Sequence, residues 1–429
     1  MKKKLLFTIA ALTILSANVY GKEGLINTFI EDSHAEFNFE AKYLKETYKE
    51  TAWGNIQPPT EVSGQVTTLK FNSGYFADII GFDFNFYGVV PINTGNQVTS
   101  PYGQYFKNGT ESFYKYAPSI KGKIGEYLEI KHGKMESNHP LLKGDHDFSP
   151  SLFDMTKVEA YFGDLTLHGL YVTRANAVNK EDFQKFGRTD WSDDWKTKNF
   201  KEKPIQIFGA EYEYENYRLY GTYGVQNNMS NYLLVEGEYN LNVNKDLRFN
   251  LASNYRRKEY PNELGDQALG MVSGRLAGFY KDLKIVASAS KAEDANNGSY
   301  GTMGNDWKPT IVPGCHGDSF YTSGIITPGN HYGETALKLE IGYDFEELIK
   351  GLYISSYYVD GRDFYNVKHD ERGYGVELSY TPPKYPSIKI MGHYANQVIK
   401  NDGSIDEWAK LNQTITETMV TVMYTTALF

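Results

Sequence analysis

HAEFNFEAKYLK, residues 34–45, alternates apolar and polar side chains along most of its length. The apolar positions are Ala35, Phe37, Phe39, Ala41 and Tyr43, and the polar positions are His34, Glu36, Asn38, Glu40 and Lys42. Successive side chains of a β-strand point to opposite faces, so this period predicts a strand with one apolar and one polar face. The same period returns in IIGFDFNFYGVV, NYRLYGTYGV and DLRFNLASNYR, and more weakly in KLEIGYDF and PSIKIMGHYAN. The chain is therefore predicted to be all-β.

Such segments predict about 18 strands along the chain. They lie near residues 34–46, 65–76, 79–92, 115–124, 127–135, 157–162, 165–174, 205–214, 217–226, 231–241, 246–257, 268–279, 283–291, 334–345, 351–360, 373–381, 387–397 and 414–429.

The connections between these strands alternate in length. Eight are short: Ala77–Asp78, Gly125–Glu126, Gly163–Asp164, Glu215–Asn216, Asn242–Lys245, Tyr280–Asp282, Glu346–Lys350 and Pro382–Pro386. The other nine are mostly longer and rich in Gly, Pro, Asn and Asp. This asymmetry is typical of a transmembrane antiparallel up-and-down β-barrel with short periplasmic turns and long external loops. A closed sheet also pairs every backbone group, as lipid requires, whereas a secreted β-sandwich would not explain the alternation.

The first residues predict export. Lys2–Lys4 precede an apolar run, Leu5–Ser16, and small residues follow near Val19 and Gly21, which is the layout of a secretory signal. We expect residues 1–21 to be a signal peptide and residues 22–429 to form an outer-membrane β-barrel porin domain. Removing three lysines from 44 basic residues leaves 41 against 53 acidic ones, a net charge of −12 that argues against a nucleic-acid partner. The single cysteine, Cys315, cannot form an internal disulfide.

A barrel of about 18 strands is wide enough to hold an aqueous channel, so its polar face is expected to line water. On strand parity, several basic side chains share this face, and we predict that they form one track for a solute carboxylate. The predicted track consists of Arg218, Arg248, Arg256, Arg275, Lys284 and Lys389. A guanidinium matches the shape of a carboxylate, and a row of weak sites lets a solute enter and leave quickly.

The connection Glu136–Thr156 is the predicted constriction of this channel. Pro140 and Pro150 bracket apolar residues that are expected to pack against the inner wall. Its candidate solute contacts are His139, Lys143, Asp145, His146, Asp147 and Asp154. The spacing of these histidines and acids matches neither a closed zinc site nor a calcium loop, and no Gly-x-Ser-x-Gly elbow occurs, so no metal, cofactor or enzymatic activity is expected.

Several stretches resemble the OprD-type substrate-specific porins. They are LEIKHGKMESNHPLLKGDHDFSPSLFD, DLTLHGLYVTRANAVN, FIEDSHAEFNFEAKYLKE, KGLYISSYYVDGRD and PSIKIMGHYAN, which occur in family order over nearly the whole mature chain. The resemblance implies an 18-stranded barrel with one pore per chain, narrowed by external loops three and seven, which admits small, mostly carboxylate-bearing nutrients. It also implies a ladder of basic side chains, in which Lys389 matches a position, while the neighbourhood of Tyr357 and Asp360 lacks the family's arginines. The seventh loop corresponds to Ala292–Gly333.

The sequence thus predicts an outer-membrane porin for passive diffusion of small charged organic nutrients, such as amino acids and carboxylates. The alternatives are a sugar-specific or general porin and, in another class, a non-conducting barrel that acts as an adhesin or structural anchor. The expected location is the outer membrane of a Gram-negative bacterium, with both termini periplasmic. The expected partners are outer-membrane lipid, lipopolysaccharide and small-molecule solutes, and the expected state is a monomer or loose homotrimer.

Overall fold

The computed structural model describes most of the chain. The described residues are 29–49, 59–95, 105–107, 109–142, 148–176, 181–186, 203–227, 230–260, 267–293, 321–323, 333–364, 369–401 and 413–428. The predicted signal peptide lies outside them. Within these ranges, no helix has the length and apolar character that a membrane crossing requires.

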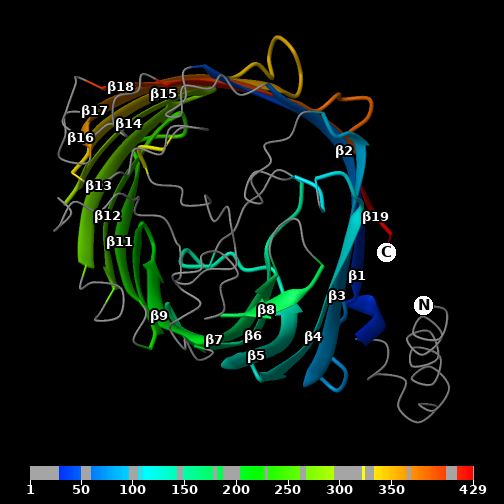
Figure 1. Ribbon diagram of the computed structural model, residues 1–429. Helices are drawn as coiled ribbons and strands as arrows, with labels where there is room; N and C mark the ends of the chain where they lie inside the picture. Colours follow the sequence, from blue (N-terminus) through cyan, green and yellow to red (C-terminus); the bar gives the residue numbers. More distant parts are fainter. Residues whose placement is uncertain are drawn as a thin grey trace, which may run out of the picture.

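The described residues form β-strands joined into one curved sheet (Figure 1). The strands are β1 (His34–Lys49), β2 (Thr60–Asn72), β3 (Ile80–Asn93), β4 (Phe113–Ile124), β5 (Leu128–Met135), β6 (Leu152–Phe162), β7 (Leu165–Asn176), β8 (Phe183–Lys185), β9 (Ile205–Tyr214), β10 (Tyr217–Gln226), β11 (Ser230–Asn242), β12 (Leu247–Tyr260), β13 (Gln267–Tyr280), β14 (Leu283–Ala292), β15 (Thr335–Asp344), β16 (Leu352–Phe364), β17 (His369–Tyr380), β18 (Ile388–Asn401) and β19 (Gln413–Ala427).

The sheet closes on itself. Each wall strand pairs antiparallel with its neighbours, and β19 pairs with β1 from Glu36↔Ala427 to Lys49↔Thr414. β8 pairs with the end of β7 at Arg174–Asn176, beyond the part of β7 that pairs with β9. In the described part of the chain, 18 strands therefore form the wall, which confirms the predicted closed antiparallel barrel.

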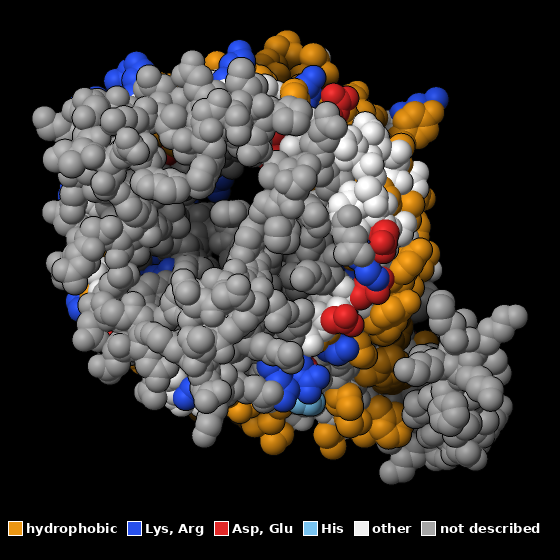
Figure 2. All heavy atoms as spheres, viewed as in Figure 1, with side chains coloured by type: hydrophobic (Ala, Val, Ile, Leu, Met, Phe, Trp, Pro, Cys, Tyr) orange, Lys and Arg blue, Asp and Glu red, His pale blue; other side chains and the backbone are white. Residues whose placement is uncertain are grey.

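The two faces of the wall differ as the alternation predicts. On β19, Val420, Val422 and Tyr424 point outward and are exposed, whereas Glu417 and Thr421, on the other side-chain parity, point inward and are buried. Figure 2 shows hydrophobic side chains in orange along the outside of the wall. Apolar side chains that face lipid need no covering layer, so the usual single core between two layers is replaced here by packing of loops inside the barrel.

Two apolar clusters form where connections fold against the inner wall. In the first, Leu141 and Leu142 of the β5–β6 connection pack with wall residues that include Met155 and Ile207. In the second, Phe148 and Phe106 pack with wall residues of β1 to β4. The rings of Phe106 and Phe148 meet edge-on at 5.2 Å between centroids. The expected packing of the β5–β6 connection against the inner wall is thus found.

Short turns connect the strands at one end of the barrel. Two-residue connections join β6 to β7, β9 to β10 and β13 to β14, and they include Gly163, Glu215 and Lys281 with φ of 61°, 47° and 48°. Tight hairpins whose backbone twist matches that of the strands require such positive φ values. Longer connections, among them 94–112, 136–151 and 293–334, lie between the other strand ends.

Most strand boundaries differ from the prediction by a few residues, and the starts of β2 and β6 differ most. β6 starts at Leu152 rather than near 157, so the β5–β6 connection ends at residue 151 and Asp154 belongs to β6. Leu152 and Phe153 are both buried and a bulge follows at Asp154/Met155, which interrupts the alternation that marks a strand. β2 spans Thr60–Asn72 rather than 65–76. It ends at Asn72 because the Ser73 hydroxyl accepts a hydrogen bond from the Phe82 N–H and the chain turns there. The short strand β8 was not predicted.

Candidate functional site in the channel

A cavity of about 900 Å³ lies against the inner face of β10 to β15. Among the described residues, its lining includes six basic side chains, Arg218, Arg248, Arg256, Arg275, Lys284 and Lys338, and three acidic ones, Glu236, Glu238 and Glu340. Asn138 and Pro140 of the β5–β6 connection and Tyr321 of the β14–β15 connection complete one side. The cavity thus brings together five of the six residues of the predicted basic track, and it adds Lys338.

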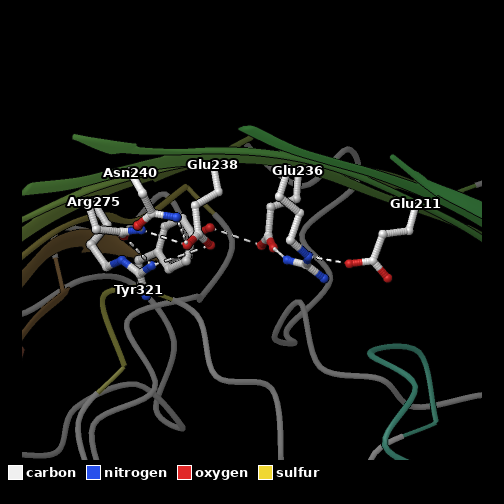
Figure 3. Close-up of polar contacts among 8 residues, drawn as sticks. Glu211, Glu236, Glu238, Asn240, Arg275 and Tyr321 are labelled. Carbon is white, nitrogen blue, oxygen red and sulfur yellow. Dashed lines mark hydrogen bonds and ion pairs between the residues drawn. The ribbon is translucent and has the colours of Figure 1, made fainter. Parts of the chain in front are cut away.

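The first half of this lining alternates in charge from strand to strand. Arg218 on β10 lies between Glu211 on β9, which accepts a hydrogen bond from its Nε, and Glu236 on β11, whose Oε1 is 2.9 Å from its Nη1. Figure 3 shows Glu211, Glu236 and Glu238 in a row along the wall, with Arg275 and Tyr321 at one end. Strands lie about 4.8 Å apart, so opposite charges follow each other at that spacing.

In the second half the cations also lie beside acidic or amide side chains, but the charge does not alternate from strand to strand. Arg275 on β13 donates from Nη2 to Asn250 Oδ1 at 2.7 Å and lies 3.9 Å from Glu238. The Glu340 carboxylate on β15 forms ion pairs with Lys284 Nζ at 2.6 Å and Lys338 Nζ at 3.1 Å. Arg248 is placed differently, with its guanidinium carbon 4.2 Å from the centroid of the Phe279 ring. Four of the six described cations of the lining thus lie beside acids, and we call this arrangement the charge lattice. The lining has three more cations than acids, or two more when Glu211, the partner of Arg218, is counted.

Three residues of the β14–β15 connection are attached to this lattice. Tyr321 donates from Oη to Glu236 Oε2 at 2.9 Å, and its ring centroid lies 4.8 Å from the guanidinium of Arg275. Thr322 bonds Ser290 on β14 at 2.9 Å, and Ser323 accepts Lys338 Nζ through its carbonyl at 2.9 Å. Burial, and then the neighbouring Glu236 carboxylate, raise the pKa of Tyr321, so its phenol stays a neutral donor. The expected second constriction, Ala292–Gly333, therefore contacts the lumen wall at these residues.

His139 fixes the β5–β6 connection to the wall at β7 and β10. Its Nε2 lies 3.2 Å from His168 Nε2 on β7 and 3.0 Å from Tyr220 Oη on β10. Its Nδ1 accepts the N–H of Leu141 at 3.1 Å, which assigns the proton of the neutral ring to Nε2. Burial lowers the pKa of His139 to about 3, so the ring is neutral at physiological pH.

The two ends of the same connection are held separately. Glu136, next to β5, accepts a hydrogen bond from the Tyr87 hydroxyl and lies 3.3 Å from Lys70. Near β6, the carbonyl of Pro150 accepts Lys115 Nζ at 2.8 Å. Lys115 is 1% exposed, so this ammonium is enclosed by the connection that it binds. The connection is thus anchored at β2 to β4 as well as at β7 and β10.

The remaining candidates are distributed as follows. His139 itself is absent from the described cavity lining, whereas its neighbours Asn138 and Pro140 are part of it. Asp154 lies in β6 with a carboxylate oxygen 3.9 Å from Arg174 Nε. Lys389 on β18 has an exposed side chain and is not among the described residues that line the cavity. Lys143, Asp145, His146 and Asp147 lie outside the described residues. No group of three or more metal-binding side chains occurs in the described ranges.

Sequence reasoning missed Tyr321, Glu340's second partner Lys338, and the anchoring residues Tyr87, Lys115 and His168. Lys338 and Glu340 lie two positions apart on one strand and therefore share a face, so strand parity alone could have placed Lys338 on the inner face. Tyr321 lies in a long connection, where no periodic signal fixes the direction of a side chain.

The family described as "outer membrane porin, OprD family" matches residues 27–428 of the chain. Among solved structures, the chain is similar to OccAB3 of Acinetobacter baumannii, with 15% identity, a TM-score of 0.75, and coverage of 93% of this chain and 100% of that one. It is similar to OpdK of Pseudomonas aeruginosa, in a structure with vanillate, with 18% identity, a TM-score of 0.76 and coverage of 93% and 100%. A BenF-like porin from Pseudomonas fluorescens Pf-5 has 16% identity, a TM-score of 0.76 and the same coverage. No curated protein shows a significant match.

Proposed function

Because the chain belongs to the OprD family of outer membrane porins, we propose that it lets small charged organic nutrients diffuse passively through a loop-constricted aqueous channel. Amino acids and small carboxylates are the proposed solutes. Porins are channels rather than enzymes, and the proposal assigns the chain no catalytic role. Both termini are proposed to face the periplasm, the state to be a monomer or loose homotrimer, and the partners to be outer-membrane lipid, lipopolysaccharide and the solutes themselves.

The observation that carries this proposal is the charge lattice of the cavity. A channel conducts when its sites attract a solute without holding it. Arg218 and Arg275 each lie beside an internal carboxylate, so a solute carboxylate competes with Glu211, Glu236 or Glu238 for them and leaves readily. The excess of three cations favours carboxylates, and the neighbouring acids offer a place for an ammonium group. Both features suit a solute that carries one or both charges.

The vanillate in the similar OpdK structure is a ligand of that protein, and its carboxylate is the solute chemistry that we propose here. A sugar-specific porin would need aromatic rings free to contact sugar. Besides Phe249, the described rings of this lining each lie against an arginine: Tyr220 against Arg218, Phe279 against Arg248 and Tyr321 against Arg275. This favours charged solutes instead.

The test is solute uptake by purified protein. In planar bilayers we expect discrete conductance steps, and a protein that never raises conductance would support a non-conducting adhesin or anchor. In liposomes, arginine and benzoate should enter faster than a neutral sugar of similar size, and the reverse order would favour a sugar-specific porin. Arg275→Gln should slow benzoate, whereas Arg257→Gln, which removes an arginine on the outer face of β12, should leave uptake unchanged. Equal uptake by both variants would contradict the role of the lattice.

A further inference from the structure

The outer face of β16 and β17 changes from apolar to charged within one side-chain repeat. Tyr358 and Tyr374 pair in register, point outward and are each 47% exposed. Tyr394 on β18 adds a third ring, 6.3 Å from Tyr374. The next outward positions beyond Tyr358 and Tyr374 are Asp360 and Arg372, which also pair in register.

The position of this change sets its level in a membrane. Tyrosine rings of outer-membrane barrels gather at the two lipid–water boundaries, where the ring body is in lipid and the hydroxyl in water. Charged side chains one repeat beyond such rings lie at the level of lipid headgroups. β16 and β17 run from this level to the connections 345–351 and 381–387 at the short-turn end. The charged group is thus at the opposite end, which in this class of barrel faces outward from the cell.

Asp360, Arg362 and Arg372 form one compact unit at this level. Asp360 Oδ2 accepts a hydrogen bond from Arg362 Nε at 2.8 Å and lies 2.7 Å from Arg362 Nη2, and Oδ1 accepts a hydrogen bond from Arg372 Nε at 3.0 Å. The Asp360 side chain is 13% exposed, whereas those of Arg362 and Arg372 are 62% and 48% exposed. Asp360 therefore orients two guanidinium groups that both remain open to the outside.

The unit has more donors than its own acceptor uses. Two arginines offer about ten N–H groups, and the three nitrogen atoms in contact with Asp360 leave about seven N–H groups for another acceptor. One carboxylate against two guanidinium groups leaves one positive charge within the unit, and the exposed Asp363 that follows Arg362 offsets it in the surrounding surface. Asp370 and Lys400, which pair in register beside them, add no net charge. Two oriented guanidinium groups with N–H groups left to donate fit the oxygens of a phosphate group, which accepts bidentate hydrogen bonds from arginine.

A surface ion pair is the simpler explanation, and the chain contains one for comparison. Arg257 and Glu259 lie on the outer face of β12, 2.7 Å apart and 44% and 41% exposed. This pair uses one cation for one anion. The unit at Asp360 differs by its second arginine, its enclosed carboxylate and its three neighbouring tyrosines.

We propose that Arg362 and Arg372, held by Asp360, bind a phosphate group of outer-leaflet lipopolysaccharide, with Tyr358, Tyr374 and Tyr394 beside its acyl chains. This inference rests on the proposed placement of the barrel in the outer membrane. It assigns residues to a lipid contact on the wall that is separate from the channel cavity.

The experiment measures binding of bisphosphorylated lipid A to the full-length protein in detergent, by native mass spectrometry. Arg362→Gln/Arg372→Gln should lower the affinity about tenfold, and Arg257→Gln should leave it within about twofold of the unchanged protein. Asp360→Asn, which keeps both arginines, should weaken binding because it removes the group that orients them. Dephosphorylated lipid A should bind all four proteins equally weakly.

Three results would overturn the proposal. They are unchanged lipid A binding by the double variant, equal losses in the Arg257→Gln control, and equally tight binding of phosphatidylglycerol, which would move the site to another lipid. Heat-modifiable migration on gels checks that each barrel is folded, and the single variant Arg362→Gln replaces the double variant if that one does not fold. Conductance of the same preparations separates the two proposals: variants that conduct normally without binding lipid A leave the porin function intact, and loss of conductance in all proteins counts against that function alone.

Discussion

Removal of one hydroxyl group, in Tyr321→Phe, should loosen the β14–β15 connection inside the channel. The phenylalanine keeps the ring over Arg275 and loses only the hydrogen bond from Oη to Glu236 at 2.9 Å. Hydrogen bonds to charged groups contribute about 1.5–3 kcal/mol. Tyr321 is half-buried, so the lower end applies, which corresponds to about a tenfold change in the equilibrium between attached and detached connection. Glu236 would also have one donor fewer and would interact more strongly with passing cations.

Single-channel recording in planar bilayers measures both effects. We expect the current substate with a detached connection to become about tenfold more populated. We also expect the reversal potential in a salt gradient to shift in the direction of higher cation selectivity. Thr322→Val is the matched control, because it removes the neighbouring bond to Ser290 without changing any charge. It should increase fluctuations and leave the reversal potential unchanged. If Tyr321→Phe alters neither the substates nor the reversal potential, Tyr321 does not hold this connection in the way that we infer.

Three further outcomes follow from the lumen. Arg218→Gln leaves Glu211 and Glu236 without their shared cation, so cation-to-anion permeability from bilayer reversal potentials should rise by about twofold or more; an unchanged ratio would contradict the charge lattice. When the β5–β6 connection is attached, the pKa of His139 is about 3, below the usual value of about 6.5. Between these pH values a detached connection therefore binds a proton that the attached one does not. Attachment should thus be independent of pH above about 6.5 and weaken as pH falls toward 3, and His139→Gln should reduce this dependence in conductance–pH curves. Lys115→Met keeps the volume of the side chain and removes an enclosed ammonium, so urea unfolding in detergent should change by about 1 kcal/mol or less, whereas Lys115→Ala should destabilise by about 2–3 kcal/mol through the cavity that it leaves.

The strand order and closure of the barrel were predictable because every wall strand lies between lipid and water. That environment imposes alternation on each strand, and the observed bounds of β9 and β10 equal the predicted ones. The prediction failed where the environment is different. Phe153 packs with Leu141 and Leu142 of the β5–β6 connection, and Leu152 packs with Phe183 of β8. Both successive side chains are therefore buried and the alternation disappears.

The site was predictable only as a set of residues on one face. Strand parity placed Arg218 and Arg275 toward the lumen, but their acidic partners depend on the register between strands, which a single strand does not reveal. Of the predicted basic track, Arg218, Arg275 and Lys284 lie in ion pairs with glutamates of other strands. The contacts of His139 with His168 and Tyr220 were not predictable, since a connection's contacts depend on how it folds over distant strands. Its predicted role as a solute contact stays a prediction.

The pairing of β1 with β19 has a consequence for how the chain assembles. Thr425 donates from its hydroxyl to Asn38 across this seam, and 387 positions separate the two residues. Bringing such distant segments together costs about 5 kcal/mol of chain entropy, (3/2)RT ln n, before any bond of the seam forms. Local hairpins can form early because two-residue turns join their strands, whereas the seam needs the last strand to be present. Until then the nascent sheet has two open edges, and a chain that ends before β19 keeps both of them and is prone to pair with other molecules.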